Sequence, residues 1–250
     1  MKLALLSDIH ANIHALEACL AHAQNQGALQ LAFLGDYVGY GADPGAVVQR
    51  IMTLKEQGAL VLKGNHDELA VAPPKDVRTV GDSTAHWTHE QLGDGQKSFL
   101  ASLPMTVRQE QVLLVHASAD APQLWRYVYE PHAARISLDA ASAIPQVRYV
   151  FGGHVHMQTL YYRAEDGSLT QIEPVADVAV PVPRRRHWLA TIGSVGQPRD
   201  GNPKAMYALF DPDQAQLTFH RVAYDHLAAA QAIRRAGLPD FFAQRLELGR

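Results

Sequence analysis

Short apolar runs alternate with amphipathic segments along the first half of the chain. Buried strands are predicted over residues 3–6, 31–34, 60–62, 112–115 and 148–151. Asn12 can cap a helix that ends near Gly27, and Asp43 with Pro44 can begin a second helix that ends near Gly58. This rhythm of strand and helix predicts α/β layers with some parallel strand pairing.

The second half of the chain has the pattern of an antiparallel sheet. Runs over 160–163 and 169–172 flank Glu165-Asp166-Gly167-Ser168, which is a hairpin signal, and further strands are predicted over 187–192, 205–210 and 217–222. Helices are predicted over 83–91, 95–103, 225–236 and 239–246, whereas 118–145 has no clear pattern. We expect two sheets face to face with helices outside, in a single domain of residues 1–250 on which the helices of 225–248 pack.

Composition narrows the class of protein. The chain has 250 residues, of which 47% are hydrophobic, as expected of a globular protein with a core. A net charge of −3 disfavours nucleic-acid binding, and the lone Cys19 excludes an internal disulfide and a thiolate metal cage. The apolar run before Asp8 is too short for a signal peptide, and no stretch is long enough to cross a membrane. We therefore expect a cytoplasmic protein, and homo-oligomerisation stays open.

Residues that can bind metal ions or take part in catalysis follow each predicted strand of the first half. The strand ends carry these side chains: Asp8 and His10, Asp36, Asn65 and His66, His116, and His154 and His156. In open α/β sheets, ligands bind at the carboxyl ends of the strands, so these segments can meet in one crevice. Each motif alone is weak evidence, because a D-x-H or H-x-H pair is common on ordinary surfaces. Five strand ends with donors of the same kind indicate one site.

The donors indicate the kind of ion. Carboxylate, amide and imidazole groups without thiolates suit borderline divalent ions, with Mn favoured and Fe, Zn, Ni or Co also possible. Seven donors are too many for one four-coordinate zinc, but they suit two ions that share a carboxylate. A pair of such ions is the usual clamp for phosphoryl chemistry.

These residues resemble a known family. The blocks D8-x-H10, G35-D36, G64-N65-H66-D67, H116 and G153-H154-x-H156 are similar to the signature of the calcineurin-like metallophosphoesterases. The loop GSVGQPRDG at 193–201 and the C-terminal stretch resemble a bacterial single-domain branch of phosphodiesterase type. The resemblance implies a four-layer α/β/β/α sandwich of two mixed sheets flanked by helices.

The resemblance also implies a role for each residue. The first metal ion would be held by Asp8, His10, Asp36 and His156. The second would be held by Asp36, Asn65, His116 and His154, with Asp36 bridging. A hydroxide between the two ions would attack the phosphorus, and His66 would protonate the leaving oxygen.

The chain departs from parts of the family pattern. Relatives often carry an acid three residues after the bridging aspartate, to orient the catalytic histidine, but here Gly39 occupies that position. Tyr40, Asp67 or a water molecule could replace it. No arginine follows, which disfavours the phosphoprotein phosphatases. Before the glycine of the 193–201 loop, Thr191-Ile192 replaces a frequent Asn-Pro.

Substrate contacts are predicted less sharply. Trp125, Arg126 and Tyr127 follow His116 and could stack on a base and touch a phosphate, or the aromatic rings could belong to the core. Arg199 could bind a phosphate or pair with a surface acid such as Asp200. We expect a small phosphoester or nucleotide-like substrate and phosphodiesterase activity. A phosphomonoesterase or dinucleotide-polyphosphate hydrolase is the alternative, and a non-enzymatic metal-binding scaffold is a distant third.

Overall fold

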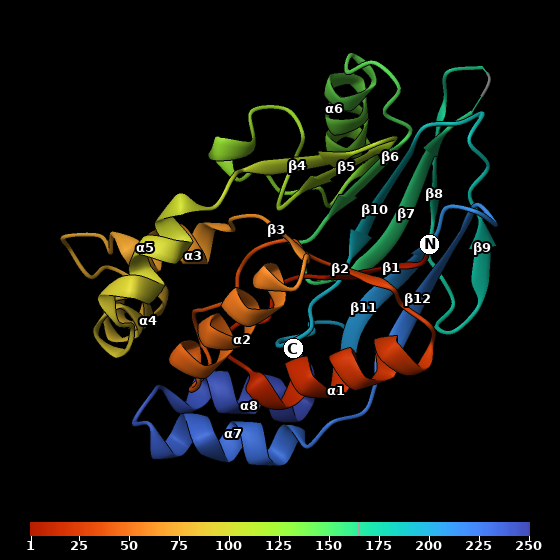
Figure 1. The fold of residues 1–250 in the computed structure, drawn as a ribbon. Helices are drawn as coiled ribbons and strands as arrows, with labels where there is room; N and C mark the ends of the chain where they lie inside the picture. The colour runs from red at the N-terminus through yellow and green to blue at the C-terminus, as the bar shows by residue number, and fades with distance from the viewer. Residues whose placement is uncertain (165) are drawn as a thin grey trace.

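Two six-stranded mixed sheets lie face to face in the computed structural model, which describes residues 1–164 and 166–250 (Figure 1). The first sheet has the order β3 (Leu60–Val61), β2 (Gln30–Phe33), β1 (Leu3–Leu6), β11 (Ala205–Asp211), β12 (Gln216–Val222) and β9 (Ala179–Pro181). The second sheet has the order β4 (Thr106–Gln109), β5 (Val112–Val115), β6 (Tyr149–Gly152), β10 (Trp188–Ile192), β7 (Gln158–Arg163) and β8 (Leu169–Ile172).

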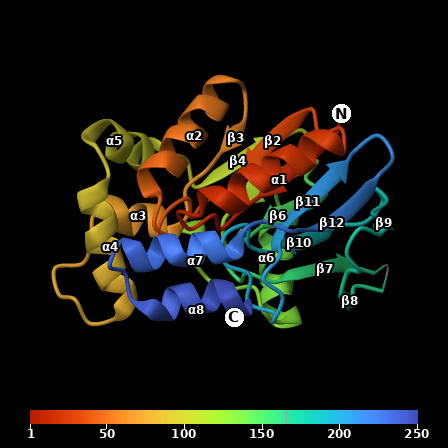
Figure 2. The same cartoon turned by 90° about the horizontal axis from the view of Figure 1, so that it is seen from below.

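Eight α-helices in the described residues surround the sheets. They are α1 (Ile13–Asn25), α2 (Pro44–Glu56), α3 (Asn65–Val71), α4 (Val80–Gln91), α5 (Asp94–Ser102), α6 (Pro131–Ser142), α7 (His226–Arg235) and α8 (Asp240–Leu248). Helices α1 and α2 lie outside the first sheet and α6 lies outside the second, while α7 and α8 run side by side next to α1 (Figures 1 and 2).

Alternating side chains on the central strands create the layers. In β1, Leu5 enters the core between the two sheets, whereas Leu6 enters the core beneath α1 and α2. In β5, Leu114 faces the other sheet, whereas Leu113 packs under α6. Because both strands are buried on both faces, each reads as a continuous apolar run. The predicted four-layer α/β/β/α sandwich is confirmed.

Parallel pairing positions the candidate site. β1 pairs in parallel with β2, β2 with β3, and β5 with β6, so the carboxyl ends of neighbouring strands meet at one edge. β10 was expected to be antiparallel, and it is antiparallel to β7 but parallel to β6. β7 and β8 form the predicted hairpin pair, although Glu165 of its turn lies outside the described residues.

Several elements differ from the sequence-based expectation. Helix α4 begins earlier than predicted, because the Thr79 hydroxyl accepts the Asp82 N–H at 3.1 Å while Asp82 accepts the Thr79 N–H at 2.8 Å. Helix α6 lies in the unassigned 118–145 segment and begins with Pro131. The short helix α3 and the edge strands β4 and β9 were not predicted. No helix in the described parts of the chain is long and apolar enough to cross a membrane.

Candidate metal centre

Backbone hydrogen bonds join the loops that follow the strands into one rigid edge. The Asp8 N–H donates to the Gly35 carbonyl and the His10 N–H to the Asp36 carbonyl, both at 3.0 Å. The His154 N–H donates to Asp8 Oδ2 at 2.9 Å, which ties the second sheet to the first. These bonds hold loops from distant parts of the sequence at fixed spacing.

The backbone of this edge is strained where it presents the candidate ligands. Five of them have positive φ angles: Asp8 (54°), His10 (48°), Asp36 (55°), His154 (67°) and His156 (58°). Positive φ is uncommon outside glycine, although Asp and His tolerate it better than bulkier residues, and such conformations cluster at functional sites. The strain indicates that the fold holds these side chains against local preference.

Two glycines allow the close approach that the site requires. An added Cβ on Gly153 would lie 2.0 Å from Ser7 Oγ and 2.3 Å from Asp8 Oδ2. An added Cβ on Gly64 would lie 2.2 Å from Asp36 Oδ1. Each glycine therefore lets the backbone of one loop pack directly on a candidate ligand of another.

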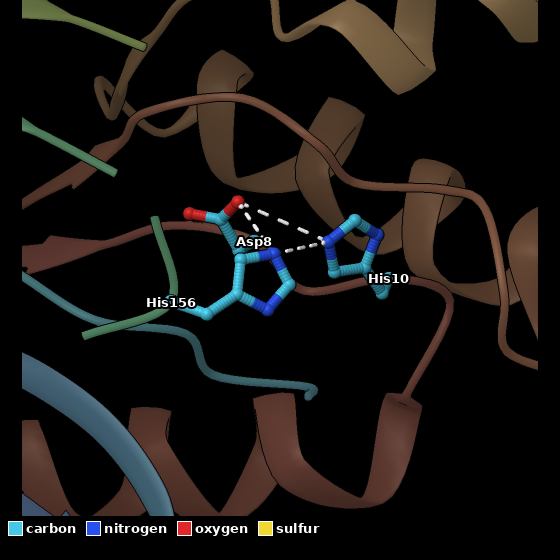
Figure 3. Close-up of side chains that lie close together, drawn as sticks. All are labelled: Asp8, His10 and His156. Carbon is cyan, nitrogen blue, oxygen red and sulfur yellow. Dashed lines mark hydrogen bonds and ion pairs between the residues drawn. The ribbon is translucent and has the colours of Figure 1, made fainter. Parts of the chain in front are cut away.

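The first ligand group is Asp8, His10 and His156, which converge from the loops after β1 and β6 (Figure 3). The Nε2 atoms of His10 and His156 are 3.0 Å apart. Asp8 Oδ1 lies 3.2 Å from His156 Nε2 and 3.8 Å from His10 Nε2. All three side chains are buried.

The second group surrounds His116 Nε2. This atom lies 3.2 Å from Asp36 Oδ2, 3.1 Å from Asn65 Oδ1 and 3.2 Å from His154 Nδ1. Asp36 Oδ2 is also 4.0 Å from His10 Nε2, so the Asp36 carboxylate lies between the two groups. The structure thus brings together all seven residues that the sequence analysis singled out as candidate ligands.

Backbone carbonyls fix the orientation of the four imidazole rings. In each ring the nitrogen that points away from the centre lies within hydrogen-bond distance of a carbonyl oxygen. These contacts are His10 Nδ1 to Val38 (3.1 Å), His116 Nδ1 to Leu34 (2.7 Å), His154 Nε2 to Trp125 (3.0 Å) and His156 Nδ1 to Gln197 (2.6 Å). A carbonyl can only accept, so the proton of a neutral ring belongs on the outer nitrogen and the inner lone pair points to the centre.

This arrangement fits cations. The inner nitrogens of His10 and His156 face each other at 3.0 Å, and the buried Asp8 Oδ1 has no hydrogen-bond partner among the residues that the structure describes. Converging lone pairs and a carboxylate repel each other unless a positive charge lies among them. Oxygen and nitrogen donors without sulfur suit Mn, Fe, Zn, Co or Ni.

The pKa shifts of most of these groups favour the charge states that metal binding requires. Burial raises the pKa of the Asp8 and Asp36 carboxyls, but the neighbouring histidines outweigh it and hold both well below the usual range. Burial lowers the pKa of His10 and lowers that of His154 to about 4. These groups are therefore anionic carboxylates and neutral imidazoles near neutral pH, as metal binding requires.

His116 shows the opposite shift. Burial lowers its pKa, but the Asp36 carboxylate outweighs burial and raises it to about 9. A ring nitrogen that binds a proton so tightly, with three acceptor atoms around it, lies at a position of strongly negative potential. Such a position also attracts a divalent cation, which would displace the proton.

His66 lies beside both groups, and its ring forms a third possible metal-binding cluster with His10 and Asp36. The backbone N–H of His66 donates to Asp36 Oδ1 at 2.7 Å. The centroid of its ring lies 4.5 Å from that of the Tyr40 ring and 5.0 Å from that of the His10 ring. An added Cβ on Gly39 would lie 2.7 Å from His66 Nδ1, so the glycine lets the ring rest on the backbone. Burial lowers the pKa of His66, while Asp36 opposes this shift.

Asp67 has a different task from the one considered in the sequence analysis. Its carboxylate accepts the N–H groups of Asp36, Tyr37 and Gly64, at 2.9, 2.9 and 2.8 Å. It therefore fixes the backbone around Asp36 rather than the His66 ring. Of the side chains considered as a replacement for the missing acid, Tyr40 is the one that contacts the ring.

Comparison with known proteins identifies the family. The family model of the calcineurin-like phosphoesterase superfamily domain matches residues 1–215. The chain belongs to this superfamily. It is therefore a metallophosphoesterase, a metal-dependent hydrolase of phosphoesters, and the resemblance noted in the sequence is confirmed.

Individual proteins are similar to the chain over nearly its whole length. The metallophosphoesterase is 32% identical over 254 residues to the uncharacterized protein MJ0912 of Methanocaldococcus jannaschii, with 99% of this chain and 98% of the other covered. A crystal structure of a metallophosphoesterase from Sphaerobacter thermophilus matches with a TM-score of 0.87 and 32% identity, covering 100% and 99% of the chains. The hypothetical protein PH1004 from Pyrococcus horikoshii OT3 shares the fold, with a TM-score of 0.79 at 19% identity and 100% and 98% coverage.

The two candidate substrate arginines of the metallophosphoesterase lie in different surroundings. Arg126 is exposed and pairs with Asp120. Arg199 does not pair with Asp200, which contacts Arg221 instead. Arg199 donates to Gln197 Oε1 at 3.0 Å and lies over the Tyr40 ring, 5.9 Å from its centroid.

The aromatic residues after β5 line the site next to His116 and His154. The Trp125 ring packs edge-on against His116, and its indole N–H donates to Glu68 at 3.1 Å. Tyr127 stacks on His154 with 4.0 Å between centroids, and Tyr129 stacks on Tyr127 at 5.1 Å. Tyr127 is 50% exposed, so it does not belong to the core.

Sequence reasoning missed the supporting role of the 193–201 loop. The buried Ser194 hydroxyl donates to the Asp8 carbonyl at 2.7 Å and accepts the Gln197 N–H at 2.8 Å. An added Cβ on Gly196 would lie 1.7 Å from the Ile9 carbonyl oxygen. The loop thus packs on the Asp8 segment and presents the Gln197 carbonyl to His156. The glycine-rich stretch signalled a tight loop, but nothing in it identified its partners.

Proposed function

We propose that this metallophosphoesterase is a phosphodiesterase that uses two divalent cations, with Mn²⁺ favoured and Fe, Zn, Ni or Co as alternatives of similar ligand chemistry. One observation carries the proposal: four buried imidazoles, each held from outside by a carbonyl, direct their inner nitrogens to two points on either side of the Asp36 carboxylate.

The two points define two ligand sets. Asp8, His10, Asp36 and His156 would hold one cation, and Asp36, Asn65, His116 and His154 would hold the other. Two bound cations supply a nucleophilic oxygen near neutral pH and neutralise the charge of the phosphate. The protein contributes a dry, rigid frame: the candidate ligands are buried apart from the partly exposed Asn65, and most are attached to the backbone of a second loop.

His66 is the proposed general acid. Its ring lies next to the ligand groups and, within the described part of the chain, has no outer carbonyl partner like those of the four other imidazoles, so it can face a substrate. Burial lowers its pKa, and a phosphate anion bound beside the ring would favour the protonated form that donates to the leaving oxygen. A general acid of this kind contributes about 10²–10⁴-fold.

The walls of the site support a diester with an aromatic or nucleotide-like group. Tyr127 and Tyr129 form an exposed stack that continues from the candidate ligand His154. Such a stack can accept a base or another flat group attached to the scissile phosphate. A phosphomonoesterase acting on nucleotides, or a dinucleotide-polyphosphate hydrolase, would place a base on the same surface, so both stay the alternatives.

The test is hydrolysis of bis(p-nitrophenyl) phosphate by protein stripped with a chelator and then reloaded with Mn²⁺. We expect no turnover after stripping and restored turnover after loading. In the loaded protein, His66→Ala should bind the same amount of Mn²⁺ but lose about 10²–10⁴-fold in kcat. His14→Ala, an exposed histidine on α1, is the control. Full activity of the stripped protein, or p-nitrophenyl phosphate as the far better substrate, would contradict the proposal.

A further inference from the structure

Two arginines from distant parts of the chain meet beside the metal centre. Arg199 follows the 193–196 turn, and Arg245 belongs to α8 near the C-terminus. Both donate to the same atom, Gln197 Oε1, at 3.0 Å from Arg199 Nη2 and 3.2 Å from Arg245 Nη1. Two guanidinium groups therefore share one neutral amide oxygen.

Neither arginine has an acidic partner within residues 1–164 and 166–250. The nearest acids in sequence are already paired: Asp200 contacts Arg221, and Glu247 contacts Arg234 at 2.5 Å. Arg199 Nε is buried and has no hydrogen-bond acceptor among the described residues. Two neighbouring positive charges and an unsatisfied buried donor leave a deficit of negative charge at this position.

The pair is one side chain away from the reacting centre. The Arg199 guanidinium lies over the Tyr40 ring, and that ring contacts both His66 and His10, with 4.5 and 4.7 Å between centroids. The Gln197 carbonyl, on the same residue whose amide both arginines touch, accepts from His156 Nδ1. An anion held by the arginines would therefore lie next to a phosphoester at the metal centre.

We propose that Arg199 and Arg245 form a subsite for a second phosphate group of the substrate. Guanidinium groups match phosphate oxygens with paired N–H donors, and two of them can hold one phosphate from two sides. The reacting phosphate belongs to the metal centre, so the subsite selects ligands with two neighbouring phosphates, such as nucleoside diphosphates and the diesters derived from them. This inference rests on the proposed function because it deepens the substrate class of the same site.

The competing explanation is structural: the arginines would only brace Gln197 and the loop that supports His156. The two explanations differ in what Gln197→Glu should do. A carboxylate in place of the amide would pair with both guanidinium groups, so it would strengthen a structural brace. It would also neutralise a phosphate subsite, so it would weaken ligand binding.

The experiment is calorimetric titration of Mn²⁺-saturated protein with AMP and with the methylene-bridged analogue of ADP, which carries one more phosphate. We expect the wild type to bind the diphosphate analogue at least about tenfold more tightly than AMP. Arg245→Gln and Gln197→Glu should each reduce this ratio by about tenfold, which corresponds to one lost charged hydrogen bond. Arg235→Gln, an exposed arginine on α7, should keep the ratio.

The outcomes separate the two proposals. Equal affinities for AMP and the analogue in the wild type would overturn the subsite, and so would an unchanged ratio in both variants. Loss of the ratio in Gln197→Glu with an unchanged or higher melting temperature would support binding over bracing. The titration needs no turnover, so failure of the wild type to hydrolyse any phosphoester would overturn the proposed phosphodiesterase without deciding the subsite, which the affinity ratio still tests.

Discussion

Replacing Gly39 with alanine should move His66 without touching a candidate metal ligand. The new Cβ would lie 2.7 Å from His66 Nδ1, where ordinary contacts begin at 3.4 Å, so the ring must retreat by roughly 0.7 Å. Misplacing a catalytic group by about 1 Å can cost 10²-fold in rate. We therefore expect kcat on bis(p-nitrophenyl) phosphate to fall by about 30–100-fold.

The substitution also has a backbone cost that must be separated from this effect. Gly39 has φ of +88°, and alanine at positive φ costs about 1–2 kcal/mol. Gly27 provides a matched control because its φ is +80° and nothing lies within 4 Å of an added Cβ. Both variants should melt about 2–8 °C lower than the wild type, by the conversion that applies to a chain of this length.

Three measurements on the Mn²⁺-loaded proteins decide the matter: kcat for the diester, metal content after dialysis, and the melting temperature. Gly39→Ala should retain its metal and lose turnover, while Gly27→Ala should lose only stability. If the two variants hydrolyse the diester at the same rate, the position of the His66 ring is not important for catalysis. If Gly39→Ala loses its metal instead, the ring belongs to the ligand set.

Two further predictions concern stability. Mn²⁺ at 100 times its dissociation constant should stabilise the protein by about 2.7 kcal/mol for each bound ion. Two ions should therefore raise the melting temperature by roughly 10–20 °C, in one transition over residues 1–250 as expected of a single domain, and Asp36→Asn should abolish the rise. Ser194→Ala removes one of the two donors to the Asp8 carbonyl, which keeps the Gly196 N–H, and takes away the acceptor of the buried Gln197 N–H, so denaturant unfolding should show a loss of about 1–3 kcal/mol; a loss below about 0.5 kcal/mol would contradict the supporting role of the loop.

The central strands could be predicted because they are buried on both faces. Residues 3–6 and 112–115 have no polar side chain, so their sequence leaves few alternatives to a central strand. The candidate ligands followed from the same logic, since each comes directly after such a strand. Their grouping in space needed parallel pairing of β1, β2 and β5 with their neighbours, and the alternation of strands with helices predicted that pairing.

The missed elements have different causes. Helix α6 buries Ala134, Ser137, Leu138 and Ala141 at helical spacing, so its pattern was present in the sequence but was overlooked within the mixed 118–145 segment. Strand β4 is an edge strand whose burial alternates weakly, and β9 has only three residues. Arg245 was also missed, because its position on α8 relates it to Arg199 only through the packing of the C-terminal helices.

Strain, burial and converging charge at the strand ends have one common explanation. Five candidate ligands at positive φ each cost roughly 1–3 kcal/mol, which together is comparable to the whole stability of a domain. Local backbone preference alone would relax these loops, so contacts between the loops must hold them in place. The His154 N–H donates to the Asp8 carboxylate, and the Ser194 hydroxyl of the 193–201 loop donates to the Asp8 carbonyl. These loops hold lone pairs directed at one another, and a cation bound among them would remove the repulsion. The same cation would offset the free-energy cost of the strained backbone. The stability of this edge and the binding of metal are therefore two aspects of one free-energy balance.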